Sequence, residues 1–519
     1  MTNILASCRS DLRPAAEPRD NQAAAVRYSS SGMLLVVDPN PDQLDLLAAT
    51  SWPDRMLILR EIGHTALKDP MHVLQGRIDA LSGWLGRFQV RAVDAQAVSM
   101  TCLSAKGSGF FDLVIDCGNP PLLDCSVLPF GYFQAGSVSE LEEALGAAQA
   151  LIGSFEKPKY FHYEAAICAH HAYGQTGCTR CLDVCGANAI QSGGAQIEIN
   201  PYLCQGCGSC TLACPTGALS FTEPERSDLL ESLRELAAGG RASRLVVSDG
   251  PLAAERLPKD STSLLVRPLT AFGEELWLVA LALGFRQIVL HATTTLEPRT
   301  AQLLDGKIET LQSMLPALGH GQGALALSTS EASLSALLST PIGDAAAPAE
   351  RGNDPDVGSK RALFNDALDR VQALEPFAPI ALPPGTALGE IVIDQQRCTL
   401  CSSCAKLCPT GAIDYSERSE PGTALLSFLE ASCVQCGICE SACPESAITL
   451  HARLASAAQR RERKTVASST MAGCADCGAQ FAADKLLRRT LERLREHDAT
   501  AAALEQAIRC PPCRARRIG

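Results

Sequence analysis

The spacing of the cysteines constrains this chain more than any other feature of its sequence. The 519 residues include 24 cysteines, and most of these stand two or three residues from the next one. The chain is large and opens without an apolar signal segment. In such a chain, cysteines at short intervals are typical of metal ligation rather than of disulfide bonds. We therefore expect several metal centres.

The most regular pattern lies in residues 390–452, which contain two runs of the form C-x2-C-x2-C-x3-C-P. Bacterial ferredoxins with two clusters have this pattern, and the fourth cysteine of each run ligates the cluster of the other run. The predicted ligands of one [4Fe–4S] cluster are Cys398, Cys401, Cys404 and Cys443. The predicted ligands of the second are Cys433, Cys436, Cys439 and Cys408.

Residues 161–223 repeat this pattern with one departure. Their second run is regular, but the first has nine residues between Cys168 and Cys178, and Gly186 stands where proline is expected. The same rule predicts two more [4Fe–4S] clusters. The ligands of one are Cys168, Cys178, Cys181 and Cys214. The ligands of the other are Cys204, Cys207, Cys210 and Cys185.

Cys168 is the least regular of these ligands because of the long spacer that follows it. His170 and His171 lie inside that spacer. One of them could replace Cys168 as a ligand, or hydrogen-bond a cluster sulfur and tune its potential. The alternative is that both are loop histidines that face solvent.

Two further C-x2-C pairs lie near the C-terminus. Their members are Cys474, Cys477, Cys510 and Cys513. Such pairs predict a four-cysteine zinc site of the ribbon kind, with a helical hairpin at 485–495 and 501–508 between them. A mononuclear iron site and a fifth cluster are the alternatives. No function is assigned to the cysteines without ligand spacing, which are Cys8, Cys102, Cys117 and Cys125.

The rest of the sequence predicts an α+β multidomain protein, with the two ferredoxin-like modules inserted among small α/β layer domains. Strand-like segments at 33–37, 56–59, 88–93 and 112–116 alternate with helical ones at 41–50 and 72–83. The predicted parts are a flexible tail (1–30), an α/β domain (31–160), a 2[4Fe–4S] module (161–223), a second α/β domain (224–340), a linker with one helix (341–389), a second module (390–452) and a basic helical tail (453–519).

The charge distribution bears on the partner. The net charge is −12; residues 451–519 hold 14 Lys and Arg against 7 Asp and Glu, which leaves −19 on the rest of the chain. An acidic body with a basic tail favours docking to a protein and disfavours nucleic acid as the main partner. The longest apolar run, 276–285, covers about half of a membrane span. We expect a cytoplasmic protein without a membrane span.

No substrate site is evident in the sequence. There is no phosphate-binding loop of the Walker kind, and the glycines of 319–323 precede a strand, which indicates a turn. The α/β segments could hold a flavin or a nucleotide at their strand ends. The interpretation that we favour is a scaffold with a docking surface, and an electron-transfer partner of an oxidoreductase rather than an enzyme.

Several segments together resemble a known family. They are EKPKYFHYEAAICAHHAYGQTGCTRCLDVC (156–185), CTLCSSCAKLCPTGAI (398–413), CVQCGICESACPESAITLHARL (433–454), CADCGAQF (474–481) and CPPCRARR (510–517). The chain resembles the large 4Fe–4S binding proteins encoded beside molybdenum-dependent formate dehydrogenases in bacteria. This resemblance implies an electron-transfer role with formate dehydrogenase, or an accessory role in maturing that molybdoenzyme.

Overall fold

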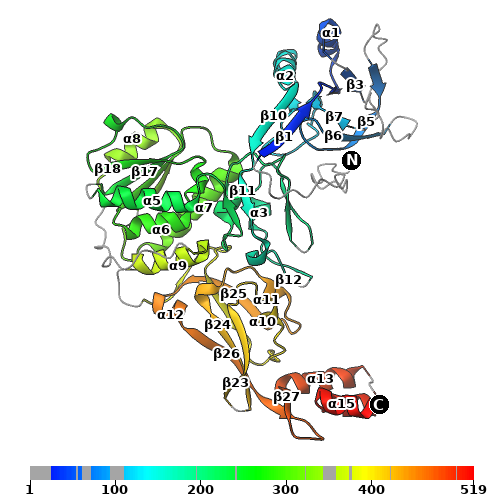
Figure 1. Ribbon diagram of the computed structural model, residues 1–519, viewed down its shortest axis with the longest axis vertical. Helices are drawn as coiled ribbons and strands as arrows, with labels where there is room; N and C mark the ends of the chain where they lie inside the picture. The colour runs from blue at the N-terminus through cyan, green and yellow to red at the C-terminus, as the bar shows by residue number, and fades with distance from the viewer. Residues whose placement is uncertain are drawn as a thin grey trace.

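The computed structural model describes residues 25–53, 56–60, 72–93, 110–172, 174–194, 196–239, 242–321, 323–342, 358–372, 377–420, 422–497 and 500–518. These residues form helices and several small sheets, which confirms the α+β multidomain class. Figure 1 shows the blue N-terminal unit at one end of the long axis and the red C-terminal tail at the other. None of the described helices is long and apolar enough to cross a membrane.

The N-terminal unit is built on a five-stranded parallel sheet in the order β4-β3-β2-β8-β9. Its strands are β2 (Leu34–Val37), β3 (Met56–Arg60), β4 (His72–Gln75), β8 (Leu113–Asp116) and β9 (Tyr132–Gln134). Helices α1 (Pro41–Ala49) and α2 (Val138–Ala150) each begin at a capping box, at Asn40 and Ser137 respectively. A second sheet contains β5 (Arg77–Ser82), β6 (Phe88–Val93) and β7 (Phe110–Phe111). The parallel core strands are buried on both faces, as expected for this class of sheet.

Two predictions for this unit were wrong. Residues 72–83 form β4 and β5 rather than a helix, because Gly76 interrupts the segment and each half pairs with a different sheet. Residues 25–30, expected in a loose tail, form β1 (Ala25–Ser30), which pairs with β10 (Gly153–Pro158). The alternation of exposed and buried residues along β1 is the period-2 pattern of a half-buried strand.

The first cysteine-rich part is closed by its two end strands. Strand β11 (Phe161–Tyr163) pairs with β16 (Leu219–Phe221), and β14 (Ile190–Ser192) pairs with β15 (Ile197–Ile199) between them. Short helices α3 (Arg180–Asp183) and α4 (Ser209–Ala213) each contain a cysteine of the predicted ligand sets. The long spacer of the first run forms the small hairpin of β12 (His171–Ala172) and β13 (Gln175–Thr176).

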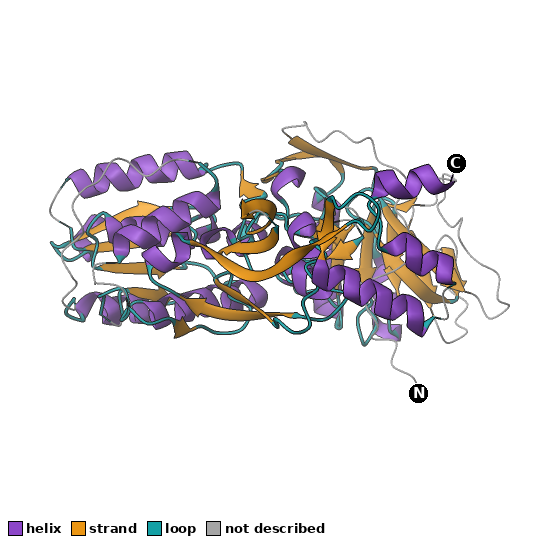
Figure 2. Ribbon diagram, turned by 90° about the horizontal axis from the view of Figure 1, so that it is seen from below, coloured by secondary structure: helices purple, strands orange, loops and turns teal. Residues whose placement is uncertain are grey.

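The second α/β unit has a four-stranded parallel sheet in the order β18-β17-β19-β20. Its strands are β17 (Arg244–Ser248), β18 (Ser261–Leu265), β19 (Gln287–His291) and β20 (Leu325–Ser328). Its helices are α5 (Arg226–Ala238), α6 (Glu274–Ala282), α7 (Pro298–Met314) and α8 (Glu331–Ser339). Helices lie on either side of strands in the left-hand part of Figure 2, where Figure 1 places α5 to α8.

Helix α9 (Lys360–Val371) belongs to this core rather than to a linker. Its side chains Leu363, Ala367 and Leu368 are buried in the same apolar cluster as Trp277 of α6. The helix therefore fixes the end of the connecting segment firmly against the second α/β unit.

The second cysteine-rich part repeats the strand pairing of the first. Strand β22 (Gly389–Ile393) pairs with β25 (Ile448–Leu454), which also pairs with β21 (Ile380–Ala381). Strand β23 (Ile413–Glu420) pairs with β24 (Thr423–Leu429). Its short helices are α10 (Ser403–Leu407) and α11 (Ile438–Ser441).

The C-terminal tail is less helical than predicted. After α12 (Ala457–Arg461), β26 (Arg463–Gly473) pairs with β24 and extends the sheet of the second cysteine-rich part. The alternating burial of β26 explains this outcome, because a period of two suits a strand and not a helix. Strand β27 (Gln480–Ala483) follows, and then α13 (Asp484–Glu496), α14 (Ala501–Ala507) and α15 (Pro511–Ile518).

Candidate metal centres

The three regular C-x2-C-x2-C loops share one backbone conformation. In each loop the residues two and four positions after the first cysteine have a positive φ. These residues are Gly206 and Gly208, Leu400 and Ser402, and Gln435 and Gly437. Backbone N–H groups around left-handed residues converge into concave sites for anions. Each loop is therefore suited to surround a negatively charged group held by its own cysteines.

The turn after the fourth cysteine is also shared, and here the irregular first run has the same geometry as the other three. The third residue after this cysteine has a positive φ in every run. These residues are Asn188, Gly217, Gly411 and Ser446. The N–H of Ala189 donates to the Cys185 sulfur at 3.2 Å, and the N–H of Ala447 donates to the Cys443 sulfur at 3.3 Å. Gly186 in place of proline therefore leaves the turn intact.

The structure gathers the cysteines of the first module into the predicted sets. Burial raises the pKa of the Cys181 thiol, and the charges of Cys178, Cys214 and Cys168 raise that pKa further. Burial also raises the pKa of the Cys210 thiol, and the charges of its neighbours Cys204, Cys207 and Cys185 raise that pKa further. Cys181 and Cys210 thus each lie among three thiols that the ferredoxin rule assigns to the same set.

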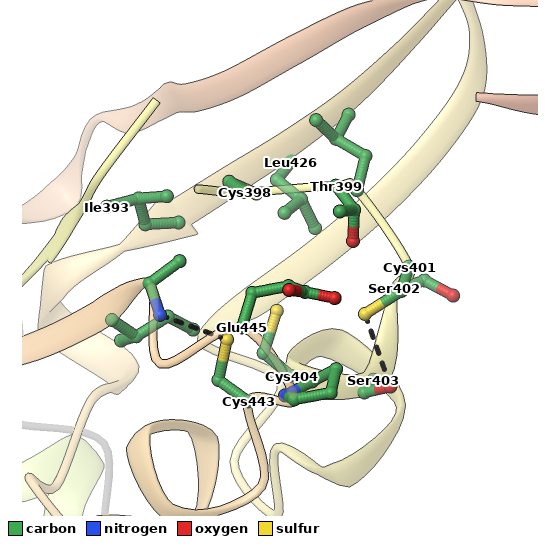
Figure 3. Close-up of a pocket in the computed structure, with 14 residues that line it drawn as sticks. Ile393, Cys398, Thr399, Cys401, Ser402, Ser403, Cys404, Leu426, Cys443 and Glu445 are labelled. Carbon is green, nitrogen blue, oxygen red and sulfur yellow. Dashed lines mark hydrogen bonds between the residues drawn. The ribbon is translucent and has the colours of Figure 1, made fainter. Parts of the chain in front are cut away.

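The second module shows the same grouping. Burial raises the pKa of Cys404 to about 12, with the charges of Cys401, Cys398 and Cys443 adding to the effect. Figure 3 shows Cys401, Cys404 and Cys443 around one pocket, which Cys398 also lines together with Ile393 and Leu426. For Cys439, burial and then the charges of Cys433, Cys436 and Cys408 raise the pKa.

These sets fit a cluster with several iron atoms better than a single ion. Among the described His, Cys, Asp and Glu side chains, the group whose ligand atoms all lie within 4.8 Å of one another is that of the C-terminal tail. The ferredoxin-like sets are more widely spaced than one ion requires. Where burial raises the pKa, as for Cys181 and Cys404, the thiol holds its proton at neutral pH in the metal-free chain, and iron would replace that proton on binding.

His170 is not placed as a ligand. Its side chain is buried, with Nδ1 at 2.9 Å from the carbonyl oxygen of Cys178 and Nε2 at 2.8 Å from the Ser192 hydroxyl. Both ring nitrogens therefore take part in hydrogen bonds, and the histidine holds the spacer against the rest of the module. The solvent-facing alternative is wrong for His170. Cys168 lies beside Cys214 and Cys178, whose charges raise the pKa of its thiol after the larger effect of burial.

Three cations that are partly or fully buried lie against the cysteine loops, and the sequence analysis did not identify them. Lys157 Nζ donates to the carbonyl oxygen of Cys204 at 2.6 Å, and Arg361 Nη2 donates to that of Cys433 at 2.6 Å. Lys360 Nζ donates to the carbonyl oxygens of Thr211 and Leu212 at 2.8 and 3.0 Å. Positive charge close to a cluster site offsets the negative charge of its thiolates and raises its reduction potential. No local motif distinguishes these residues from surface cations.

The tail cysteines form a compact site. Cys474 and Cys477 lie between β26 and β27, and Cys510 and Cys513 lie at the start of α15. The N–H of Cys510 donates to the Cys474 sulfur at 3.3 Å, and this hydrogen bond is the main cause that lowers the pKa of Cys474. A thiol of low pKa is ready to bind a metal as thiolate. This four-cysteine group can hold one metal ion.

The tail packs on the second module beside one cysteine set. Glu445, two residues after Cys443, accepts from Arg493 Nη2 at 2.7 Å and from Arg489 Nε at 3.3 Å, both on α13. Lys485 Nζ donates to the Gln395 carbonyl at 3.1 Å. Part of the basic excess of the tail is thus used in docking on the chain itself.

The left-handed glycines give a matched pair of variants. Gly437→Ala introduces a side chain at φ 84° with no atom within 4 Å of the new Cβ, so we expect a loss of roughly 1–2 kcal/mol from backbone strain alone. In Gly208→Ala, at φ 72°, the Cβ would also lie 2.4 Å from Thr270 Oγ1, so the loss should be larger. Thermal unfolding of the two variants under nitrogen measures which of them loses more stability. Equal losses would contradict the packing of Thr270 on the loop.

Comparison with known proteins agrees with this geometry. A 4Fe-4S binding domain model matches residues 197–220, 391–414 and 427–449, which contain the three regular runs. The irregular run that begins at Cys168 lies outside these matches. No curated protein matches the chain. The three matches support a ferredoxin-type iron–sulfur protein with an electron-transfer role, and such domains act with a redox partner.

Proposed function

We propose that the chain relays single electrons through four [4Fe–4S] clusters, two in each module. The observation that supports this proposal is that Cys181, Cys210, Cys404 and Cys439 each lie among three other thiols of the same predicted set. When bound, a [4Fe–4S] cluster supplies reversible uptake of one electron. The chain's own residues bind the clusters, limit the access of water and place positive charge beside them.

The ligand assignment within this proposal follows the ferredoxin rule in both modules, with Cys168 rather than a histidine in the irregular run. The proposed domain boundaries are those expected from the sequence, except that helix α9 belongs to the second α/β unit instead of the linker. Zinc is proposed for the tail site, because four thiolates close together suit a tetrahedral ion without redox chemistry.

The proposed partner is a molybdenum formate dehydrogenase. Two observations support a protein partner: the acidic body with its basic tail, and the exposure of Cys207 at one of the cysteine sets. The resemblance of the cysteine blocks and the tail to proteins encoded beside formate dehydrogenases names the partner. Oxidation of one formate to CO2 and a proton releases two electrons, so two one-electron transfers to this chain balance each turnover.

The test uses the whole chain, loaded with iron and sulfide without oxygen. We expect formate plus formate dehydrogenase to bleach its visible absorption, while formate alone leaves the spectrum unchanged. The rate should fall as salt rises, because docking between charged surfaces weakens when the screening length drops below about 8 Å. If the spectrum stays that of the oxidised protein with active enzyme at low salt, the relay proposal fails.

A second candidate is an accessory factor for maturation of that molybdoenzyme. The two α/β units favour it, because each is built on an apolar core of its own and neither contributes a cysteine to the four predicted cluster sets. Under this alternative, formate dehydrogenase produced without the chain stays inactive when the chain is added later. Under the relay proposal, the separately produced enzyme regains electron transfer on mixing.

A further inference from the structure

The contact between the two modules defines an order for the four cysteine sets. Helix α9 begins with two cations that reach opposite modules. The Lys360 ammonium is buried and donates to Thr211 and Leu212 of the first module, whereas Arg361 Nε and Nη2 donate to the carbonyl oxygens of Ala431 and Cys433 of the second. Burial lowers the pKa of Arg361 to about 10, which leaves the guanidinium charged at neutral pH. One helix end therefore holds both modules.

A third cation crosses the contact directly. Arg180 of α3 donates through Nη1 to the Val434 carbonyl at 3.0 Å and through Nη2 to the Gln435 carbonyl at 3.3 Å. Nη1 also lies 3.7 Å from the Cys178 sulfur, and Nη2 donates to the Gly385 carbonyl at 3.1 Å. The same guanidinium thus contacts a predicted ligand of one module and the ligand loop of the other.

The backbones meet closely at this point. A Cβ added to Gly177 would lie 2.4 Å from Ile438 Cγ1, so the residue before Cys178 packs on the helix that contains Cys439. Figure 1 shows β12, which pairs with β13 just before Gly177, near α11.

The two other sets lie away from this contact. The Cys185 carbonyl accepts from Arg299 Nη1 at 3.1 Å, and Cys204 contacts Lys157 near the N-terminal unit. At the opposite end, Cys398 and Cys443 lie beside the docked tail. In each module, one cysteine set thus lies at the contact between the modules, and the other set lies on the far side of the module.

We propose that the two modules form one series of four cluster sites, and that Arg180 is the positioning residue between the two inner sites. The inner sites are Cys168, Cys178, Cys181 and Cys214 on one side, and Cys433, Cys436, Cys439 and Cys408 on the other. This inference rests on the proposed relay. An electron that leaves one inner site oxidises it and reduces the other, with no other reactant. The outer sets provide the two ends, one of them open to the surface at Cys207.

The test compares Arg180→Ala and Arg180→Lys with the matched control Arg299→Ala, which removes a contact to the outer Cys185 instead. All are loaded anaerobically in the full chain and reduced with dithionite, so that formate dehydrogenase is not needed. The electron paramagnetic resonance spectrum of each reduced protein is compared with a reference spectrum. This reference is the sum of the spectra of two single-module variants, Cys178→Ala/Cys207→Ala and Cys401→Ala/Cys436→Ala. We expect the parent and Arg299→Ala to show magnetic interaction beyond this sum, and Arg180→Ala to lose most of the excess.

A potentiometric titration separates charge from folding. Arg180→Ala should shift the reduction of part of the iron signal to a more negative potential at unchanged iron content, and Arg180→Lys should restore much of the shift because it keeps the charge. A parent spectrum equal to the sum of the single-module variants would overturn the series. That result would not change the expected outcome of the formate experiment. In the same way, a failure of the formate experiment would not change the proposed order of the sites.

Discussion

A chain prepared without oxygen is expected to contain about 16 iron and 16 acid-labile sulfide atoms, because four sets of four cysteines each hold one [4Fe–4S] cluster. Cys214→Ala removes a ligand that the sequence spacing and the packing both assign to the irregular run. We expect this variant to lose about a quarter of both elements, which are measured by iron and sulfide analysis of the purified protein.

Cys117→Ala is the matched control, because Cys117 packs beside the core of the N-terminal unit, far in sequence from the cysteine runs. It should keep the full iron content. A parent chain that saturates near 12 iron atoms, and a Cys214→Ala variant with the same content, would show that the set of Cys168, Cys178, Cys181 and Cys214 holds no cluster. The first module would then be a single-cluster site.

Loss of the tail metal should have the second large effect. We expect Cys510→Ser to release the metal and unfold residues 474–513, because structural zinc in small domains contributes roughly 10–16 kcal/mol. Limited proteolysis should then cut the tail rapidly, while iron in the two modules is retained. Metal analysis of the parent should find about one zinc per chain, as expected for a closed four-cysteine site.

Glu445→Gln separates docking from metal binding. It weakens the contacts of Arg489 and Arg493 but leaves the four cysteines in place. This variant should keep its zinc and show faster cleavage only at the junction near β27. Proteolysis of Cys510→Ser at the parental rate would contradict a metal-dependent fold, and iron in place of zinc in the parent would contradict the proposed metal.

The cysteine spacing predicted the three runs that match the 4Fe-4S binding domain, because ferredoxin ligation is encoded locally. Three thiolates within seven residues follow one loop, and only the fourth ligand must be supplied from elsewhere. Even there, the repeat of alanine four residues after Cys185, Cys214, Cys408 and Cys443 marks the common turn. The matches of the family model leave out the run that ends at Cys185, which has the long spacer after Cys168.

The wrong predictions of secondary structure arose where a segment pairs with a strand that is distant in the sequence. The segment 72–83 has apolar residues that suit a helix, yet its halves belong to two sheets. Strand β26 is explained by β24, some forty residues earlier in the chain. The cations Lys360, Arg361 and Arg180 were missed for the same reason, since only the folded chain brings them to carbonyl groups far away in sequence.

The paired cations of α9 also bear on how the protein is assembled. Lys360 and Arg361 are neighbours on one helix and stabilise the ligand loops of opposite modules. When iron orders the loop of one module, that loop restrains the Lys360 or Arg361 side chain that contacts it, and the other module then loses less conformational entropy on its own loading. Loading should therefore be cooperative between modules. Intact mass spectrometry of a chain given too little iron should show mostly empty and full molecules, with few that hold one loaded module.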